Sequence, residues 1–248
     1  MKRITTLLCL ILISTGCATR QPLLWQGDFE TGDLSQWSYL LNPQGLSVQE
    51  TCVKEGRYAG RARITGEPDM LWHDNESLNR TEFSHKPSAG RTGEGQETFF
   101  GWSFYLPQSF SEHKHELGYW ESDKSYQQML RFNIIGQDFS FQESAASSPF
   151  WIKPGFASPG VWHDVVLHIG WSTDPDKGFT QVWLDGEDMG KNFFKTLYAA
   201  DESMFTQIGI LRSRDDRVET IFIDNVREAG DLDTARKALD GARSVKCN

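Results

Sequence analysis

Arginine, glutamate and histidine lie close together in one stretch of the sequence, where they could bind a charged ligand or exchange protons with it. Glu82 is two residues after Arg80, and His85 is five residues after it. On an extended strand Arg80 and Glu82 share a face, where they either form an ion pair or face a ligand together. A guanidinium binds a carboxylate through two hydrogen bonds, so Arg80 is suited to an acidic ligand. His85 and His73 lie in polar, loop-like sequence, where each is either solvated or available as a proton acceptor.

A second polar group lies in an apolar segment that is predicted to be a strand. Because successive side chains of a strand point to opposite faces, Gln127 and Arg131 share one face. Gln128 shares the other face with Leu130 and Phe132. If the apolar face is the core, Gln127 and Arg131 are the exposed pair.

Strands must position these residues, because alternation with a period of two dominates the sequence. The alternating segments are residues 100–106, 127–135, 161–171, 179–184 and 218–226. Helical periodicity appears only near the C-terminus, where one short helix is expected within residues 231–243. Strands separated by turns rich in Gly, Pro and Asp predict an all-β antiparallel jelly-roll sandwich.

Composition narrows the class of protein further. The 248 residues include nine Trp and 16 Phe, which supply enough apolar surface for a core and exclude a wholly disordered chain. The 34 acidic residues outnumber the 25 basic residues, which argues against a nucleic-acid partner. We expect a monomer.

The N-terminus resembles a targeting segment rather than part of the fold. An apolar run over residues 4–13 follows two basic residues and is too short to span a bilayer. Residues 14–17 resemble a bacterial lipobox, in which Cys17 is lipidated, although Ser14 leaves ordinary secretion as an alternative. Ala18 after the cysteine favours an outer-membrane lipoprotein of a Gram-negative cell. The expected organisation is a signal peptide over residues 1–16, a tether over 17–24 and a single domain over 25–248.

Cysteine usage agrees with an oxidising compartment. Cys9 leaves with the signal peptide and Cys17 is the expected anchor, so Cys52 and Cys247 remain. They form either a disulfide, which is favoured in the periplasm, or two free thiols.

An ordered series of motifs carries a resemblance to a known family. The motifs are residues 27–37, the Arg-x-Glu of residues 80–82, the strand ending in Tyr-Leu-Pro at 100–107, the Trp-His-Asp of 160–164, the Trp-x-Asp-Gly of 182–187 and the closing strand 221–226. Together they resemble the polysaccharide lyase superfamily with a concanavalin-like jelly roll, which includes heparin lyase I-like and glucuronan lyase-like enzymes.

The resemblance implies β-elimination at a uronic acid. The C5 proton leaves only when the neighbouring carboxylate is neutralised, a role expected for Arg80 together with Gln127 or Gln128. The residues expected to contact the substrate are Glu82, His73, Gln128, Arg131 and Arg212. An acidic protein needs a local basic cleft for such a polyanion, expected from Arg80, Lys86, Arg91, Arg131 and Arg212.

The same resemblance implies a base and an acid. His85 is the expected base with His73 in reserve, and Tyr198 is the expected acid with Tyr126 as an alternative. The family often carries Gln-x-His on the glutamine-bearing strand and a tyrosine late in the chain. Here that strand has no histidine, and Leu211 occupies the tyrosine position. The site is therefore either rebuilt or inactive.

Glu30 and Asp224 lie on the expected opening and closing strands, which are neighbours in many jelly rolls. Their carboxylates predict a structural Ca²⁺, with exposed acids at strand ends as the alternative.

The sequence thus predicts a lyase that acts on an acidic polysaccharide. The alternative is a carbohydrate-binding envelope lipoprotein without turnover on the same scaffold. A glycoside hydrolase is third, because residues 121–123 are the nearest approach to paired acids on one strand.

Overall fold

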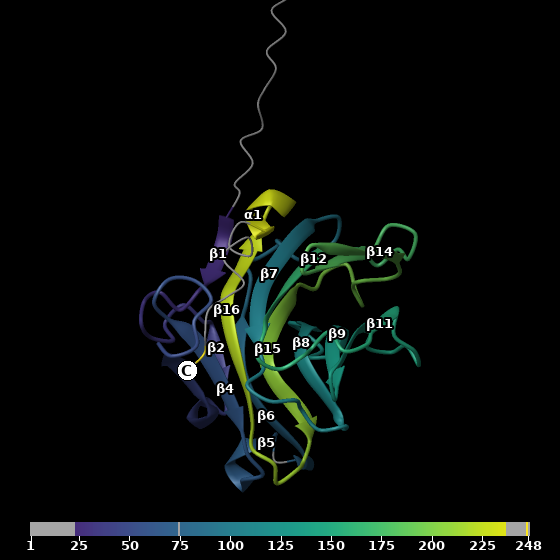
Figure 1. Cartoon of the computed structure of the whole chain (residues 1–248). Helices are drawn as coiled ribbons and strands as arrows, with labels where there is room; N and C mark the ends of the chain where they lie inside the picture. Colours follow the sequence, from purple (N-terminus) through teal and green to yellow (C-terminus); the bar gives the residue numbers. More distant parts are fainter. Residues whose placement is uncertain (1–22, 74, 237–246, 248) are drawn as a thin grey trace, which may run out of the picture.

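The computed structural model describes residues 23–73, 75–236 and 247, and these form two antiparallel sheets that face each other (Figure 1). Sheet A has the order β14 (Glu187–Phe193), β13 (Phe179–Leu184), β12 (Trp162–Gly170), β7 (Glu97–Tyr105), β16 (Glu219–Ala229), β4 (Ala59–Ile64) and β3 (Leu46–Gln49), with β1 (Leu23–Gly27) also paired to β16. Sheet B has the order β11 (Trp151–Lys153), β10 (Asp138–Glu143), β9 (Gln128–Ile135), β8 (Lys114–Ser122), β15 (Met204–Ser213), β6 (Asn75–His85) and β2 (Tyr39–Leu41), with β5 (Leu71–Trp72) paired to β6.

The remaining elements are short. Two 3₁₀ turns, η1 (Pro43–Gly45) and η2 (Pro68–Met70), precede β3 and β5, and one helix, α1 (Leu232–Arg236), follows β16. The predicted antiparallel jelly roll with one short C-terminal helix is therefore confirmed, and the predicted helical residues 237–243 lie outside the described residues. No helix in the described part of the chain is long and apolar enough to cross a membrane.

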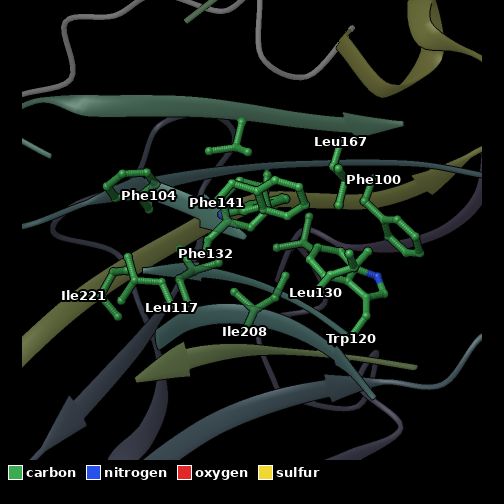
Figure 2. Close-up of a cluster of buried hydrophobic side chains, with 14 of the residues drawn as sticks. Phe100, Phe104, Leu117, Trp120, Leu130, Phe132, Phe141, Leu167, Ile208 and Ile221 are labelled. Carbon is green, nitrogen blue, oxygen red and sulfur yellow. The ribbon is translucent and has the colours of Figure 1, made fainter. Parts of the chain in front are cut away.

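The core lies between the sheets and follows from the alternation of the strands. Phe100 and Leu167 of sheet A pack toward Trp120 and Leu130 of sheet B (Figure 2). Each of these side chains is almost fully buried, which stabilises the fold by about 2 kcal/mol per residue. On β12, Val165, Leu167 and Ile169 share the face that enters this core.

A bulge between β8 and β9 changes the predicted faces of β9. Leu130 pairs with Trp120 while Gln128 pairs with Glu121, so Met129 is an extra residue on β9. Met129 and Leu130 are both buried in the core. Gln128 therefore lies on the same face as Arg131, which corrects the prediction that it shares a face with Leu130.

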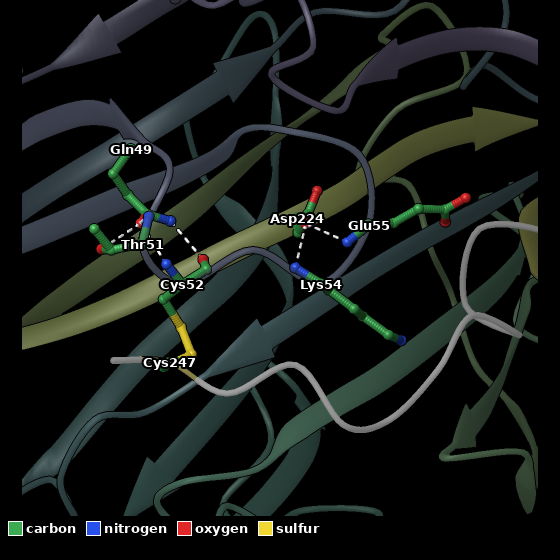
Figure 3. Close-up of a disulfide and its surroundings, with 7 residues drawn as sticks. All are labelled: Gln49, Thr51, Cys52, Lys54, Glu55, Asp224 and Cys247. Atoms are coloured by element: carbon green, nitrogen blue, oxygen red, sulfur yellow. Dashed lines mark hydrogen bonds between the residues drawn. A yellow bond between two sulfur atoms is a disulfide. The ribbon is translucent and has the colours of Figure 1, made fainter.

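A disulfide closes the outer face of sheet A. Cys52 bonds to Cys247, and the loop that follows Cys52 is held by Asp224, whose Oδ2 accepts hydrogen bonds from the backbone N–H groups of Lys54 and Glu55 (Figure 3). The buried ammonium of Lys54 pairs with Asp164 beneath the loop. This face is packed with its own small apolar cluster, so the open face of the molecule is the outer face of sheet B.

Candidate functional site

Two adjoining pockets lie on the outer face of sheet B. The large pocket has a volume of about 510 Å³ and extends over β8 and β9, and the small pocket of about 310 Å³ extends over β15 and β6. Trp72, Glu121 and Tyr126 line both pockets, so they mark the junction between them. We call the two pockets together the groove.

Arg80 lines the small pocket and is only 5% exposed. Its Nε lies 3.8 Å from Oε2 of Glu82, which is too long for a hydrogen bond, and its charge lies 5.7 Å from the ring centroid of Trp72. Within the described residues the guanidinium donates no hydrogen bond. Its donors are therefore free for an anionic ligand in the small pocket, and the role expected for Arg80 stays a prediction.

A chain of hydrogen bonds runs beneath the groove from one carboxyl group to another. The hydroxyl of Tyr119 lies 2.9 Å from Oε2 of Glu82 and 3.1 Å from Oε1 of Gln207. Nε2 of Gln207 donates to Oε2 of Glu121 at 2.6 Å. The amide of Gln207 donates to Glu121, so its oxygen accepts the proton of the Tyr119 hydroxyl. A protonated Glu82 can then donate to the Tyr119 oxygen. Every donor and acceptor in the chain is therefore satisfied when Glu121 is ionised and Glu82 is protonated.

Electrostatics agree with this assignment. Burial raises the pKa of Glu82 to about 8, although the positive charge of Arg80 opposes the shift. Burial also raises the pKa of Glu121 to about 7, again opposed by Arg80. Near neutral pH Glu82 is therefore mostly protonated, whereas Glu121 is present in both its protonated and its ionised form. A carboxyl group that titrates near 7 is suited to general acid or base catalysis.

The two carboxyl groups differ in their access to the groove. Glu82 is fully buried, whereas Glu121 lines both pockets. Tyr126 is 69% exposed at the same junction, and its backbone has a left-handed φ of 55°. This conformation costs a non-glycine residue about 1 kcal/mol, and it holds the Tyr126 ring beside the groove. Glu121 and Tyr126 are the groups that can exchange protons with a ligand at the junction.

Glu121 is not among the residues that the sequence predicts as a base, because residues 114–122 are not among the predicted strands. Tyr119 and Glu121 alternate with the buried Trp120, and this pattern is the signal that predicts both side chains on one face. Gly209 on β15 allows β6 to pack closely against it, since a Cβ there would lie 2.3 Å from the carbonyl oxygen of Thr81.

The predicted residues that line the large pocket include Gln127, Gln128, Arg131 and Tyr198. Gln128 and Arg131 both donate to the carboxylate of Glu116, so these donors are partly engaged by the protein. The hydroxyl of Tyr198 donates to the carbonyl of Gln128 at 2.6 Å, and burial raises the pKa of Tyr198. Its proton is therefore less available to a ligand.

His85 does not lie in the groove, which corrects its predicted role as the base for Arg80. Even-numbered residues of β6 such as Arg80 face the groove, whereas His85 is odd-numbered and points to sheet A. Its Nε2 lies 2.8 Å from Oε2 of Glu228 on β16, and its ring stacks on Trp25. His73, the reserve base, is exposed and lines the small pocket.

Arg212 lines the large pocket, but its guanidinium is engaged within the fold. It pairs with Glu219 and donates to the carbonyl groups of Asp215 and Arg217 in the turn between β15 and β16. Arg212 therefore has a structural role, which corrects the prediction that it contacts the substrate.

Glu30 and Asp224, the predicted calcium ligands, each accept hydrogen bonds from the backbone. Glu30 accepts from the N–H groups of Arg57 and Tyr58. Burial raises the pKa of Asp224 to about 7, although its backbone hydrogen bonds oppose the shift. Within the described residues no group of three or more His, Cys, Asp or Glu side chains could hold a metal. Both carboxylates are therefore engaged by backbone N–H groups, which suits holding the loop after Cys52 better than binding a cation. The structural Ca²⁺ stays a prediction. The predicted lipidation site, Cys17, lies outside the described residues.

The chain resembles known proteins in sequence and in fold. The profile of a family described as polysaccharide lyase matches residues 29–227. No curated protein matches the sequence. Similar solved structures include a GH131 β-glucanase catalytic domain from Podospora anserina (TM-score 0.60, 13% identity, 85% of this chain and 97% of that chain), a cellulose-induced protein (0.58, 13%, 83% and 97%) and an alginate lyase of polysaccharide lyase family 7 (0.52, 9%, 70% and 79%). At these identities the likeness to the solved structures shows the fold alone.

Proposed function

The chain belongs to the polysaccharide lyase family, and from this premise we propose that it cleaves a uronate-containing polysaccharide by β-elimination in the groove. The observation that carries the proposal is the buried guanidinium of Arg80, which opens into the small pocket without a hydrogen-bond acceptor among the described residues. A carboxylate of the substrate supplies that acceptor. Neutralising it stabilises the charge that develops when the neighbouring C5 proton leaves.

Glu121 is the base of the proposed reaction. Its carboxylate takes the C5 proton, and the electron pair of the C5–H bond becomes the second bond between C4 and C5. The bond between C4 and the glycosidic oxygen breaks with its electron pair on that oxygen, which takes a proton from Tyr126. Atoms and charge balance without an oxidant or reductant.

Glu82 supports this reaction from behind Arg80. An ionised Glu82 would compete with the substrate for the guanidinium, because the two groups lie 3.8 Å apart. Burial raises the pKa of Glu82 to about 8, so at neutral pH the carboxyl group is mostly protonated. The positive charge of Arg80 is then available to the substrate.

The test is the ultraviolet absorbance of the unsaturated uronate that elimination creates. Residues 18–248 are incubated with a panel of polyuronates and glycosaminoglycans. An increase with one polymer that is lost in Arg80→Ala supports the proposal and identifies the substrate class. A flat trace with binding by calorimetry contradicts turnover and favours the carbohydrate-binding alternative.

A hydrolase is the second candidate, because one specific observation favours it. Glu82 and Glu121 are two carboxyl groups with raised pKa values, joined through Tyr119 and Gln207. Glycoside hydrolases use such a pair as acid and base or nucleophile. Glu82 is fully buried, which favours the lyase. New reducing ends without ultraviolet absorbance identify hydrolysis.

The proposed location is the outer membrane of a Gram-negative cell, through a lipid on Cys17. The support is the sequence of residues 1–17. Expression of the full chain in a Gram-negative host, followed by mass spectrometry of the N-terminal peptide, tests the lipid. Cys17→Ser moves the protein from the membrane fraction to the soluble periplasm if the proposal holds.

A further inference from the structure

A third cavity adjoins the groove at the end of β6. It has a volume of about 330 Å³, and we call it the end pocket. Its lining includes Trp25, His85, Lys86, Arg91 and Glu228. Lys86 lines both the end pocket and the small pocket, so a ligand in the small pocket can continue past Lys86.

The charge of the end pocket favours an anion. Lys86 is exposed and Arg91 is half-buried, and neither has an ion-pair partner among the described residues. The acidic residue of the lining, Glu228, is 1% exposed and bound to His85 at 2.8 Å. Two cations therefore remain available for a ligand.

The end pocket also offers surfaces that suit a sugar. The indole of Trp25 stacks on the ring of His85 with centroids 3.7 Å apart, and it forms an apolar wall. Hydroxyl groups of Ser38 and Ser88 lie in the same lining. Such a combination of an aromatic wall, hydroxyl groups and cations fits an acidic sugar better than a small inorganic anion.

The spacing along β6 requires a long ligand. Arg80 lies on β6 and Lys86 directly follows this strand, six residues along the chain, which separates their backbones by roughly 20 Å in an extended chain. A ligand that contacts Arg80 and also enters the end pocket must therefore be an oligomer of several rings.

We propose that the end pocket is a distal subsite, where Lys86 and Arg91 bind the carboxylate of a further uronate of the polymer. The inference rests on the proposed function and adds a direction to it. β-Elimination breaks the C4–O bond of the uronate that Arg80 holds in the small pocket. Because Tyr126 protonates the departing oxygen at the junction, the departing sugar lies on the other side of the junction, in the large pocket. The units toward the reducing end then extend past Lys86 into the end pocket.

The experiment compares short and long oligomers in a chain that cannot consume them. In a Glu121→Gln background, calorimetry measures the affinity for mannuronate, guluronate and glucuronate oligomers of two and six units. The double variant Lys86→Ala with Arg91→Ala is expected to bind the six-unit oligomer of the preferred series about tenfold more weakly, with little change for the two-unit oligomer. Lys177→Ala, which removes an exposed lysine paired with Asp174, is the matched control and leaves both affinities unchanged.

Each outcome separates the subsite from the chemistry. An equal loss for both lengths, no loss, or no binding of any six-unit oligomer overturns the subsite. Length-dependent binding that requires Lys86 and Arg91, in a protein whose wild type yields no unsaturated product, supports the subsite and contradicts the proposed reaction. Thermal unfolding of each variant verifies that the loss is not caused by unfolding.

Discussion

Gln207 on β15 donates a hydrogen bond from Nε2 to Oε2 of Glu121 on β8, with 2.6 Å between the two atoms. The contact fixes the amide with its oxygen toward Tyr119, which lies opposite Gln207 in the sheet. Gln207 thereby orients Glu121 at the junction of the two pockets. The same hydrogen bond favours the ionised form of Glu121 and lowers its pKa, against the larger effect of burial.

Replacing Glu121 tests the assignment of the base. Glu121→Gln keeps the size of the side chain but cannot take a proton, so we expect kcat to fall by at least about 10²-fold. Glu67→Gln, at an exposed carboxylate outside the groove, is the control and should retain the kcat. Initial rates of unsaturated product formation measure both. Equal losses in the two variants contradict the assignment.

The pH dependence tests the role of Gln207. Because the base must be ionised, kcat/KM should rise with pH through about 7, where Glu121 titrates. Gln207→Leu removes the donor that favours the carboxylate, so the rising limb should move to higher pH. A complete pH profile of kcat/KM for both proteins is the measurement. A limb that does not move, or that moves to lower pH, argues against a positioning role for Gln207.

Arg80 is expected to be the residue that neutralises the substrate carboxylate. Arg80→Ala should lower kcat/KM by about 10²–10³-fold, the effect of removing one electrostatic contact to the transition state. Arg80→Lys retains charge but loses the two-point geometry, so it should recover only part of the rate. Arg61→Ala, at an exposed position on β4 of sheet A, is the control. Normal turnover in the Arg80→Ala variant would contradict the proposed mechanism.

Glu82 should make stability fall as pH rises. Its pKa is about 8 in the folded protein, because of burial, against an ordinary value of 4.5. Between these values the folded state holds a proton that the unfolded state has lost, so this group destabilises the fold progressively from about pH 4.5 to pH 8. Glu82→Gln should reduce that fall, so the variant gains stability relative to wild type as pH rises. Urea unfolding at pH 6 and pH 9 measures it, with the exposed Glu67→Gln as the control.

The disulfide is expected to stabilise the fold without affecting turnover. Cys52 and Cys247 are 195 residues apart, so the bond removes a large closed-loop entropy from the unfolded chain. The double Cys→Ala variant should lose about 2–5 kcal/mol in the free energy of unfolding. Its kcat should be retained, because the disulfide lies on sheet A and the groove on sheet B. Reductant should lower the free energy of unfolding of the wild type and leave that of the double variant unchanged.

Sequence alone was sufficient to predict the class of fold and several residues of the groove, among them Arg80 and Tyr126. The alternation in strands such as β12 predicts which side chains enter the core, because burial of one face imposes a period of two. The spacing of Arg80 and Glu82 likewise places both on one face of β6. The same parity excludes His85 from that face, although its distance along the chain appeared favourable.

Only the tertiary structure decided which partners surround Arg80. Glu121 and Gln207 are brought to it by the pairing of β8 with β15 and of β15 with β6, and this pairing joins segments distant in sequence. The bulge at Met129 depends on packing between strands, so no local pattern predicts that Gln128 joins Arg131. Burial also determines the pKa values of Glu82 and Glu121. Composition and spacing can thus identify groups capable of chemistry, but solvent exclusion and cross-strand contacts determine which of them exchange protons near neutral pH.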